Sequence, residues 1–222
     1  MELKFEDIIR DKAPGLEVML VEADVDNCAT TDRLWSAIMA ECSRLSREFP
    51  MDRIRHRGAI AATREAYKAC GKEPNRYRPS AEALCRRAVK GMELYRSLSV
   101  IDLINLVSMA SGHSIGGFDA DKIAGDTLTM GVGLPGEPYE AIGRGDLNIE
   151  GLPVWRDAEG GIGTPTSDNV RTCLEVSSQR VVMTVNMFGH GEMDRDATES
   201  LIRSLLEEHA SARNIRVKYF QP

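Results

Sequence analysis

The chain has 222 residues, of which 42% are hydrophobic and 28% are charged. These proportions are ordinary for a globular protein. No apolar run approaches the roughly 18 residues that cross a bilayer, and the first residues lack the basic start and apolar block of a signal peptide. We therefore expect a soluble, cytoplasmic protein without a membrane partner. The five cysteines are widely and irregularly spaced, which predicts reduced thiols rather than a disulfide framework.

The net charge of −6 is unevenly distributed along the chain. Residues 44–96 contain 14 Lys and Arg but only six Asp and Glu, so this segment carries +8 and the remainder −14. A basic segment can attract a phosphate backbone, although solvated helix faces have the same composition. The candidates for nucleic-acid binding are Arg53, Arg55, Arg57, Arg76, Arg78 and Arg87.

The first half of the chain reads mainly as helices. A buried strand is predicted over residues 16–23, before the first long helix. That helix begins after Thr30 or Thr31, which are suitable N-caps, and ends before Pro50. Residues 72–79 contain two prolines and are predicted to form a loop. Further helices are predicted over 54–70, 80–91 and 100–110.

The pattern changes after Gly112, where short apolar runs alternate with turns. Strands are predicted over 127–132, 138–142, 152–156, 172–176 and 180–188. A capping box at residues 196–199 predicts the start of a last helix. Alternation over residues 215–219 predicts a closing strand. A helical first half followed by a strand-rich second half favours an α/β (α+β) fold, and no linker divides residues 1–222.

No cofactor or metal site is expected. The glycines of residues 131–136 resemble a dinucleotide-binding loop, but a proline lies in the turn and no helix is predicted to follow. The four histidines are far apart and lack metal-binding spacing. There is no GxSxG nucleophile motif. The sequence therefore identifies no catalytic residue.

Several polar residues lie beside glycines or apolar residues. Asp102 and Asn105 interrupt an apolar helix, where they either tie a neighbouring loop to the helix or form the floor of a pocket. The pair Gly116-Gly117 either makes a turn or lets a ligand approach the backbone closely. Glu175 is predicted within a strand, where it faces either solvent or a cavity.

These residues belong to a series of motifs. The sequence Ile101-Asp102-Leu103-Ile104-Asn105 resembles the VDxxN motif of the B3/B4 tRNA-binding and editing domain of the phenylalanyl-tRNA synthetase beta subunit. The family's GQPxHAFD segment follows in register at residues 112–119. Residues 121–125 resemble its D-K-(I/L)-x-G, and 173–175 its strand ending in LE. Residues 78–84 and 87–91 resemble free-standing members, and the whole resemblance covers about residues 55–190.

The resemblance implies a three-layer β/β/α sandwich of the B3/B4 type. It also implies a tRNA or aminoacyl-tRNA partner and an aminoacyl pocket. The substrate-binding residues implied are Asn105, Gly116, Gly117, Asp119, Thr164, Thr166 and Glu175. Glu175 corresponds to the glutamate that recognises a tyrosine hydroxyl in the family. Two departures are evident: the family's histidine falls on Gly116, and residues 163–168 replace its glycine-rich loop.

Three functions remain open on the sequence. The leading interpretation is a stand-alone tRNA-binding domain that hydrolyses mischarged aminoacyl-tRNA in trans. The second is a protein that binds a free amino acid or related metabolite and has lost editing activity. The third is a structural domain without an active pocket. The first two require Asn105, the Gly116-Gly117 pair and Glu175 to meet at one hollow.

Overall fold

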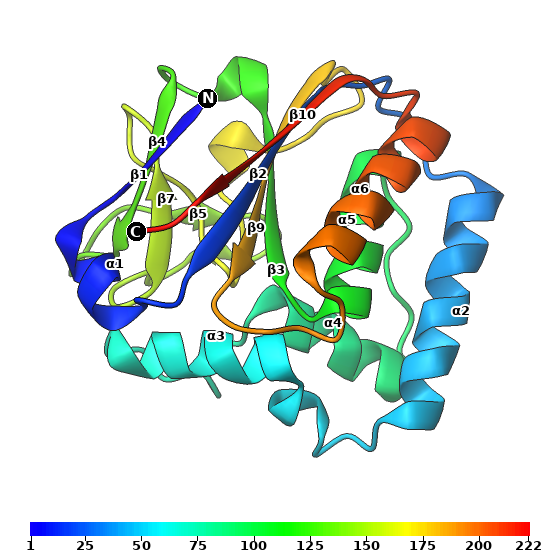
Figure 1. Cartoon of the computed structure of the whole chain (residues 1–222), viewed down its shortest axis with the longest axis horizontal. Coiled ribbons are helices and arrows are strands. Elements are labelled where there is room, and N and C mark those ends of the chain that lie inside the picture. The colour runs from blue at the N-terminus through cyan, green and yellow to red at the C-terminus, as the bar shows by residue number, and fades with distance from the viewer.

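A computed structural model describes all residues from Met1 to Pro222. Two four-stranded sheets pack face to face, and helices cover the outer face of the second sheet (Figure 1). The first sheet has the order β1 (Glu2–Phe5), β4 (Thr127–Val132), β7 (Pro153–Arg156), β8 (Gly161–Gly163). The middle sheet has the order β10 (Arg213–Phe220), β2 (Glu17–Asp24), β9 (Arg180–Met187), β3 (Ser114–Asp119). Only β1 and β4 pair in parallel.

The helices form the third layer and one end of the molecule. Their bounds are α1 (Asp7–Lys12), α2 (Asp32–Glu48), α3 (Gly58–Ala69), α4 (Ser80–Val89), α5 (Ser99–Ser111) and α6 (Arg195–Ala210). In Figure 1, α5 and α6 lie against the middle sheet, α2 lies outside them, and α3 runs beneath the sheets. Three short 3-10 helices complete the chain: η1 (Ile54–His56), η2 (Ala120–Lys122) and η3 (Val170–Thr172). No helix combines the length and apolarity that a transmembrane segment needs.

Side-chain alternation in the middle sheet produces the layers. In β2, Val18 and Leu20 join the core between the two sheets, whereas Met19 and Val21 join the core beneath the helices. In β9, the odd-numbered residues 181–187 belong to the helix-side core. Successive side chains of a strand point to opposite faces, so both faces of this sheet must be covered. The predicted three-layer β/β/α sandwich is thereby confirmed.

Elements with strong periodicity lie close to their predicted positions. The strand predicted over 16–23 is β2, and those predicted over 127–132 and 180–188 are β4 and β9. Helix α2 begins after Thr31, whose Oγ1 accepts a hydrogen bond from the backbone N–H of Leu34 at 3.3 Å. Helix α5 ends at Gly112, whose φ of +83° is the left-handed conformation that glycine readily adopts.

Three predicted elements are wrong in part. The helix predicted over 54–70 is divided into η1 and α3, because Arg57 has an extended backbone with φ −60° and ψ 136°. The strand predicted over 172–176 is instead the end of η3 and a turn, closed when the backbone N–H of Ser178 donates to the carbonyl of Glu175. The strand predicted over 138–142 shrinks to β5 (Glu140–Ala141), paired with β6 (Gly145–Asp146).

The last helix begins earlier than the predicted capping box. Asp194 is its N-cap, and its Oδ1 accepts a hydrogen bond from the backbone N–H of Ala197 at 2.8 Å. Strands β1, β3, β6 and β8 and helix α1 have no counterpart among the elements expected from the sequence. In β3 the glycine pair forms a strand paired with β9 rather than a turn. Position 116 needs glycine, because a Cβ there would lie 2.7 Å from the ring of Phe118 and 2.9 Å from Oγ1 of Thr184.

Candidate functional site

A hollow of about 370 Å³ lies where α5, the edge strand β3 and the segment 164–174 meet. This volume is at the lower end of small-molecule sites. Aliphatic side chains form much of its wall, and polar groups are distributed among them. The lining residues are Ser80, Ile101, Ile104, Asn105, Ser108, Ile115, Gly117, Ile142, Thr164, Thr166, Ser167, Asp168, Val170, Cys173 and Leu174.

Helix α5 supplies one wall of the hollow. Its lining residues, Ile101, Ile104, Asn105 and Ser108, follow the i, i+3, i+4, i+7 spacing of one helical face. The side-chain amide of Asn105 has no hydrogen-bond partner in the protein and is available to a ligand. Asp102 has the structural role instead, because its Oδ2 accepts hydrogen bonds from Oγ1 of Thr30 at 2.5 Å and from the backbone N–H of Ser97 at 2.9 Å.

The segment after β8 supplies the opposite wall and is held by its own hydroxyl groups. Oγ1 of Thr164 accepts from the backbone N–H groups of Thr166 and Ser167 at 3.2 and 3.1 Å, and it donates to the carbonyl of Ser167 at 3.0 Å. The hydroxyl of Thr166 pairs with that of Tyr67 on α3 at 2.8 Å. The backbone N–H of Ser80 bonds the carbonyl of Pro165 at 2.8 Å. The wall is therefore a fixed turn.

Asp168 is the single charged residue among those that line the hollow. Its Oδ2 accepts a hydrogen bond from the backbone N–H of Gly117 at 3.0 Å, whereas its Oδ1 receives none. Protein atoms surround the carboxyl group closely, but the hollow leaves the side chain partly accessible. Desolvation raises the pKa of Asp168 to about 7, although the N–H of Gly117 acts in the opposite direction.

The structure brings together four of the seven predicted substrate-binding residues: Asn105, Gly117, Thr164 and Thr166. Gly116 faces the other side of β3, toward Phe118. Asp119 lies outside the hollow, where its carboxylate accepts hydrogen bonds from Oγ of Ser178 at 2.7 Å and from the backbone N–H of Asp121 at 3.0 Å. The role of Asp119 is to hold the turn after β3.

Glu175 also lies outside the hollow, contrary to the expected convergence. Its side chain is 56% exposed and pairs with Nζ of Lys122 at 3.0 Å. The cause is the turn that replaces the predicted strand. Leu174 still lines the wall of the hollow, but the turn directs the side chain of the next residue, Glu175, away from it. The acid in the hollow is Asp168, which sequence reasoning missed. The available signal was an aspartate directly after the Thr-Pro-Thr-Ser turn of residues 164–167.

Comparison with known proteins identifies the family. A family model described as the B3/4 domain matches residues 62–217, which is more than two thirds of the chain. The chain belongs to the B3/4 domain family. The resemblance read from the motifs is thus confirmed.

One solved structure that matches this B3/4 domain is an N-terminal fragment of the phenylalanyl-tRNA synthetase beta-subunit from Pyrococcus horikoshii. The two chains share 12% sequence identity with a TM-score of 0.49. The match covers 97% of this chain and 50% of that fragment, so the chain spans about half the length of this relative. No curated protein matches the sequence.

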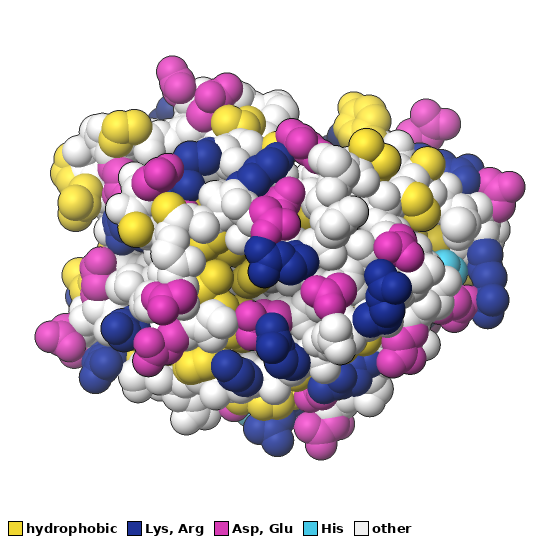
Figure 2. All heavy atoms as spheres, turned by 90° about the horizontal axis from the view of Figure 1, so that it is seen from above, with side chains coloured by type: hydrophobic (Ala, Val, Ile, Leu, Met, Phe, Trp, Pro, Cys, Tyr) yellow, Lys and Arg dark blue, Asp and Glu magenta, His cyan; other side chains and the backbone are white.

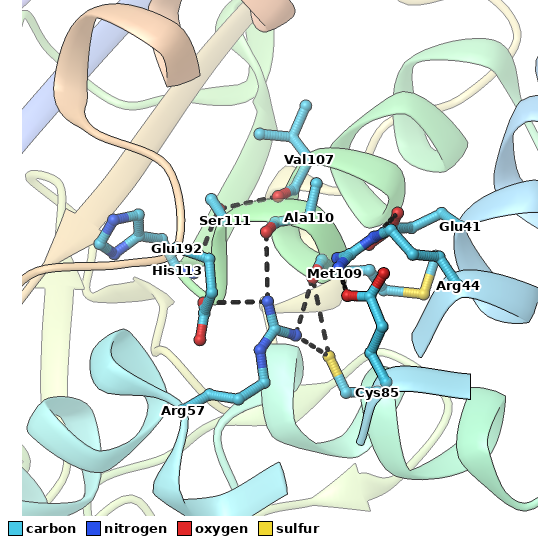
Figure 3. A network of polar contacts seen from close by, with 11 residues as sticks. Glu41, Arg44, Arg57, Cys85, Val107, Met109, Ala110, Ser111, His113 and Glu192 are labelled. Carbon is cyan, nitrogen blue, oxygen red and sulfur yellow. Dashed lines mark hydrogen bonds and ion pairs between the residues drawn. The ribbon is translucent and has the colours of Figure 1, made fainter. Parts of the chain in front are cut away.

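Arg57 of this B3/4 domain has a structural position, which corrects its predicted role in nucleic-acid binding. The residue is buried, and its Nη1 donates to the carbonyl of Met109 at 2.8 Å and contacts Sγ of Cys85 at 2.9 Å (Figure 3). Its Nη2 donates to the carbonyl of Ala110 at 3.1 Å and pairs with Oε2 of Glu192 at 2.9 Å. Arg57 therefore joins the end of α5 to the loop before α6 and cannot contact a phosphate backbone.

The charge of Arg57 also affects its neighbours. Burial, and then the charge of Arg57, lowers the pKa of His113 to about 4, so the imidazole is neutral at physiological pH. Burial raises the pKa of the Cys85 thiol to about 12, even though the guanidinium lies beside it. Cys85 is therefore a protonated structural thiol rather than a nucleophile.

Other cations of the basic segment are also engaged within the protein. Arg64 pairs with the buried Glu82 at 2.8 Å, and Lys72 donates to the carbonyls of Asn148 and Glu150 at 2.7 Å. Arg87 donates to the carbonyl of Glu93. These contacts reduce the charge that the segment presents to solvent.

Four of the predicted arginines remain exposed: Arg53, Arg55, Arg76 and Arg78. Arg78 lies 3.9 Å from Glu82, a long and weak ion pair. Figure 2 shows the face that lies away from α3, and there Lys and Arg side chains are interspersed with Asp and Glu. No group of three or more His, Cys, Asp or Glu side chains is placed to hold a metal ion.

The position of Arg57 predicts a large effect of Arg57→Ala on stability. Removing the buried guanidinium takes the ion-pair partner from the partly exposed Glu192 and a donor from the carbonyls of Met109 and Ala110, and losing such hydrogen bonds to a charged group costs about 3 kcal/mol. Urea denaturation measures the free energy of unfolding. Arg53→Ala is the control, because an exposed substitution changes stability by about 0.5 kcal/mol or less. Equal stability of the two variants would refute the structural role of Arg57.

The environment of Asp168 predicts a pH-dependent gain in stability for Asp168→Asn. The pKa of Asp168 is about 7 in the folded state, above the ordinary value of 3.8. Between pH 3.8 and about pH 7 the folded state therefore binds more protons than the unfolded state. As a result, the free energy of unfolding of the wild type falls as the pH rises through this range. The amide carries no charge, and its oxygen still accepts from Gly117. The difference of about three between the two pKa values corresponds to roughly 4 kcal/mol at about 1.4 kcal/mol for each pKa unit, and solvent at the partly accessible side chain reduces this value. We therefore expect the variant to be about 1–3 kcal/mol more stable than wild type at pH 8 and equally stable near pH 4.

Urea denaturation at the two pH values tests this difference. Glu175→Gln makes the same chemical change at an exposed carboxylate and should shift stability little at either pH. A variant Asp168→Asn that is less stable than wild type at pH 8 would show that the ionised carboxylate stabilises the fold.

Proposed function

We propose that this B3/4 domain binds tRNA and hydrolyses mischarged aminoacyl-tRNA in trans, with the aminoacyl group in the hollow beside α5. The observation that carries the proposal is a hollow of about 370 Å³ that contains the free amide of Asn105 and the backbone of Gly117. It lies within the residues that match the B3/4 family. Membership of the family and an accessible pocket at its motif residues support the same function.

The hollow supplies part of the chemistry that ester hydrolysis needs. Attack of water on an aminoacyl ester places negative charge on the carbonyl oxygen, and hydrogen-bond donors aimed at this oxygen accelerate the reaction. The Asn105 amide has such donors and no competing partner in the protein. Because Glu175 points to Lys122 and the walls are mainly aliphatic, we favour an aliphatic aminoacyl group over tyrosine.

The exposed arginines give the tRNA a place to bind. Arg53 and Arg55 lie just before α3, and Arg76 and Arg78 lie in the loop after it, which leads into α4 and Ser80 at the hollow. Helix α3 has 12 residues, which corresponds to about 18 Å. Arginines at its two ends can therefore contact separate phosphates of one backbone.

We expect the chain to bind tRNA with an affinity that falls steeply with salt, because each phosphate contact releases counterions. The substitutions Arg53→Ala, Arg55→Ala and Arg76→Ala should each weaken binding and lower the salt slope by about 1. Filter binding from low to moderate salt measures both quantities. Arg213→Ala on β10 is the control, since this exposed arginine lies outside the basic segment. Undetectable tRNA binding at low salt would end the proposal.

Hydrolysis is predicted to depend on Asn105. Among tRNAs mischarged with different amino acids, we expect the chain to release an aliphatic amino acid. Asn105→Ala should lower the rate on the order of 100-fold, the usual effect of losing one transition-state donor. Asn148→Ala, in an exposed loop, is the matched control. A panel of mischarged tRNAs that all remain charged, or full activity of Asn105→Ala, would contradict the proposed chemistry.

A second candidate function is the binding of a free amino acid or related metabolite. It is favoured by the burial of Arg57 and Arg64, which removes two cations from any RNA-binding surface. In this case, free amino acids raise the unfolding temperature, and tRNA has no effect. The tRNA-binding measurement above separates the two functions.

A further inference from the structure

The carboxyl group of Asp168 is incompletely paired within the hollow. The N–H of Gly117 bonds Oδ2 at 3.0 Å, and no protein donor bonds Oδ1. No Lys, Arg or His lines the hollow, and Asp168 takes part in no ion pair. A structural carboxylate in a sheltered position normally has its hydrogen-bonding capacity filled. One oxygen of Asp168 is instead left for a group that enters from outside.

The residues around Asp168 indicate the size and polarity of the ligand that could enter the hollow. Apart from Cys173, the apolar lining consists of aliphatic side chains: Ile101, Ile104, Ile115, Ile142, Val170 and Leu174. No aromatic ring lines the hollow to stack on a flat ligand. A space of about 370 Å³ suits a small molecule. The complementary ligand is therefore small and aliphatic, with one positively charged donor.

We propose that Asp168 binds a protonated primary amine on an aliphatic ligand, which for an amino acid or its ester is the α-ammonium group. The ammonium would donate to Oδ1, while Gly117 continues to hold Oδ2. This inference deepens the proposed function. It rests on that function only because both place the ligand in the same hollow.

Burial strengthens this interaction. A charge pair screened from water is stronger than one on the surface, and an ammonium restores the favourable environment that the carboxylate lacks. The pKa of Asp168, raised to about 7 by desolvation, reflects the missing partner. At pH 8 the carboxyl group is mostly ionised and a simple alkylamine is protonated, so both charges are present.

A pair of probes of equal shape tests the proposal. At pH 8, 3-methylbutylamine and 3-methylbutan-1-ol are titrated separately into the ¹⁵N-labelled chain, and the amide signal of Gly117 reports occupancy. We expect the amine to bind about tenfold more tightly than the alcohol, as is usual for a hydrogen bond to a charged group. Asp168→Asn should remove this preference without changing the affinity for the alcohol.

Matched variants make the result decisive. Glu175→Gln is the control, because it changes a carboxylate outside the hollow and should preserve the preference for the amine. If the NMR spectrum of Asp168→Asn lacks the dispersion of a folded chain, Asp168→Ala serves as a second variant. Three results would overturn the proposal. The two probes could bind equally to the wild-type chain, neither probe could bind, or the preference for the amine could persist in both Asp168 variants. If the carboxylate of Asp168 acts only as a general base, the wild-type chain will bind the amine and the alcohol equally.

The test is independent of RNA. A chain that prefers the amine but binds no tRNA keeps this inference and loses the proposed function. A chain that deacylates tRNA but does not distinguish the two probes keeps the proposed function and loses the role of Asp168.

Discussion

Burial of the middle sheet on both faces is the constraint on which the rest of the fold depends. Because β2 and β9 carry apolar side chains on alternate sides, the chain must supply a second sheet for one face and helices for the other. Strand β3 is the edge of this sheet next to β9, so one side of its backbone lacks a strand partner. The N–H of Gly117 on that side is bonded by the carboxylate of Asp168. An unpaired edge needs such a partner, and the hollow forms where a side chain rather than a strand provides it.

Helix α5 links this edge to the helical layer. Its apolar positions pack into the helix-side core, while the stripe that includes Ile104 and Asn105 faces the hollow. Its first turn is fixed when the hydroxyl of Thr30 donates to Asp102, and its last turn is fixed when Arg57 donates to the carbonyls of Met109 and Ala110. Both ends of the helix are therefore held by polar contacts from distant parts of the chain. This arrangement keeps Asn105 in place without using its own amide, which stays available for binding.

The sequence predicts the layers and part of the site for physical reasons. Hydrophobic periodicity indicates which side chains are buried, so the sequence locates β2, α2, β4 and β9 closely. Asn105 and Gly117, which belong to the family motifs, both line the hollow. Hydrophobic periodicity does not show which hydrogen-bond or ion-pair partners a residue has. The apolar run around Glu175 predicts a strand, but the hydrogen bond from the N–H of Ser178 to the carbonyl of Glu175 makes a turn, and the side chain pairs with Lys122 outside the hollow. Nor can a count of charges show that Arg57 is buried, because Glu192 lies 135 residues away.

Arg57 and Asp168 are two sheltered charges that the protein compensates to different degrees. The terminal nitrogens of Arg57 contact an acid, two carbonyls and a thiol, all from the protein itself. Asp168 lines the hollow with one backbone donor at Oδ2 and no hydrogen-bond partner at Oδ1. Ionisation of a sheltered carboxyl without full compensation opposes folding. At Arg57 the contacts of the two terminal nitrogens offset much of this cost, although the buried Nε has no partner. A cationic ligand would remove this cost at Asp168 on binding, and the stability lost in the free protein would then contribute to affinity. This coupling makes the hollow, rather than the larger basic segment, the part of the molecule best suited to discriminate among ligands.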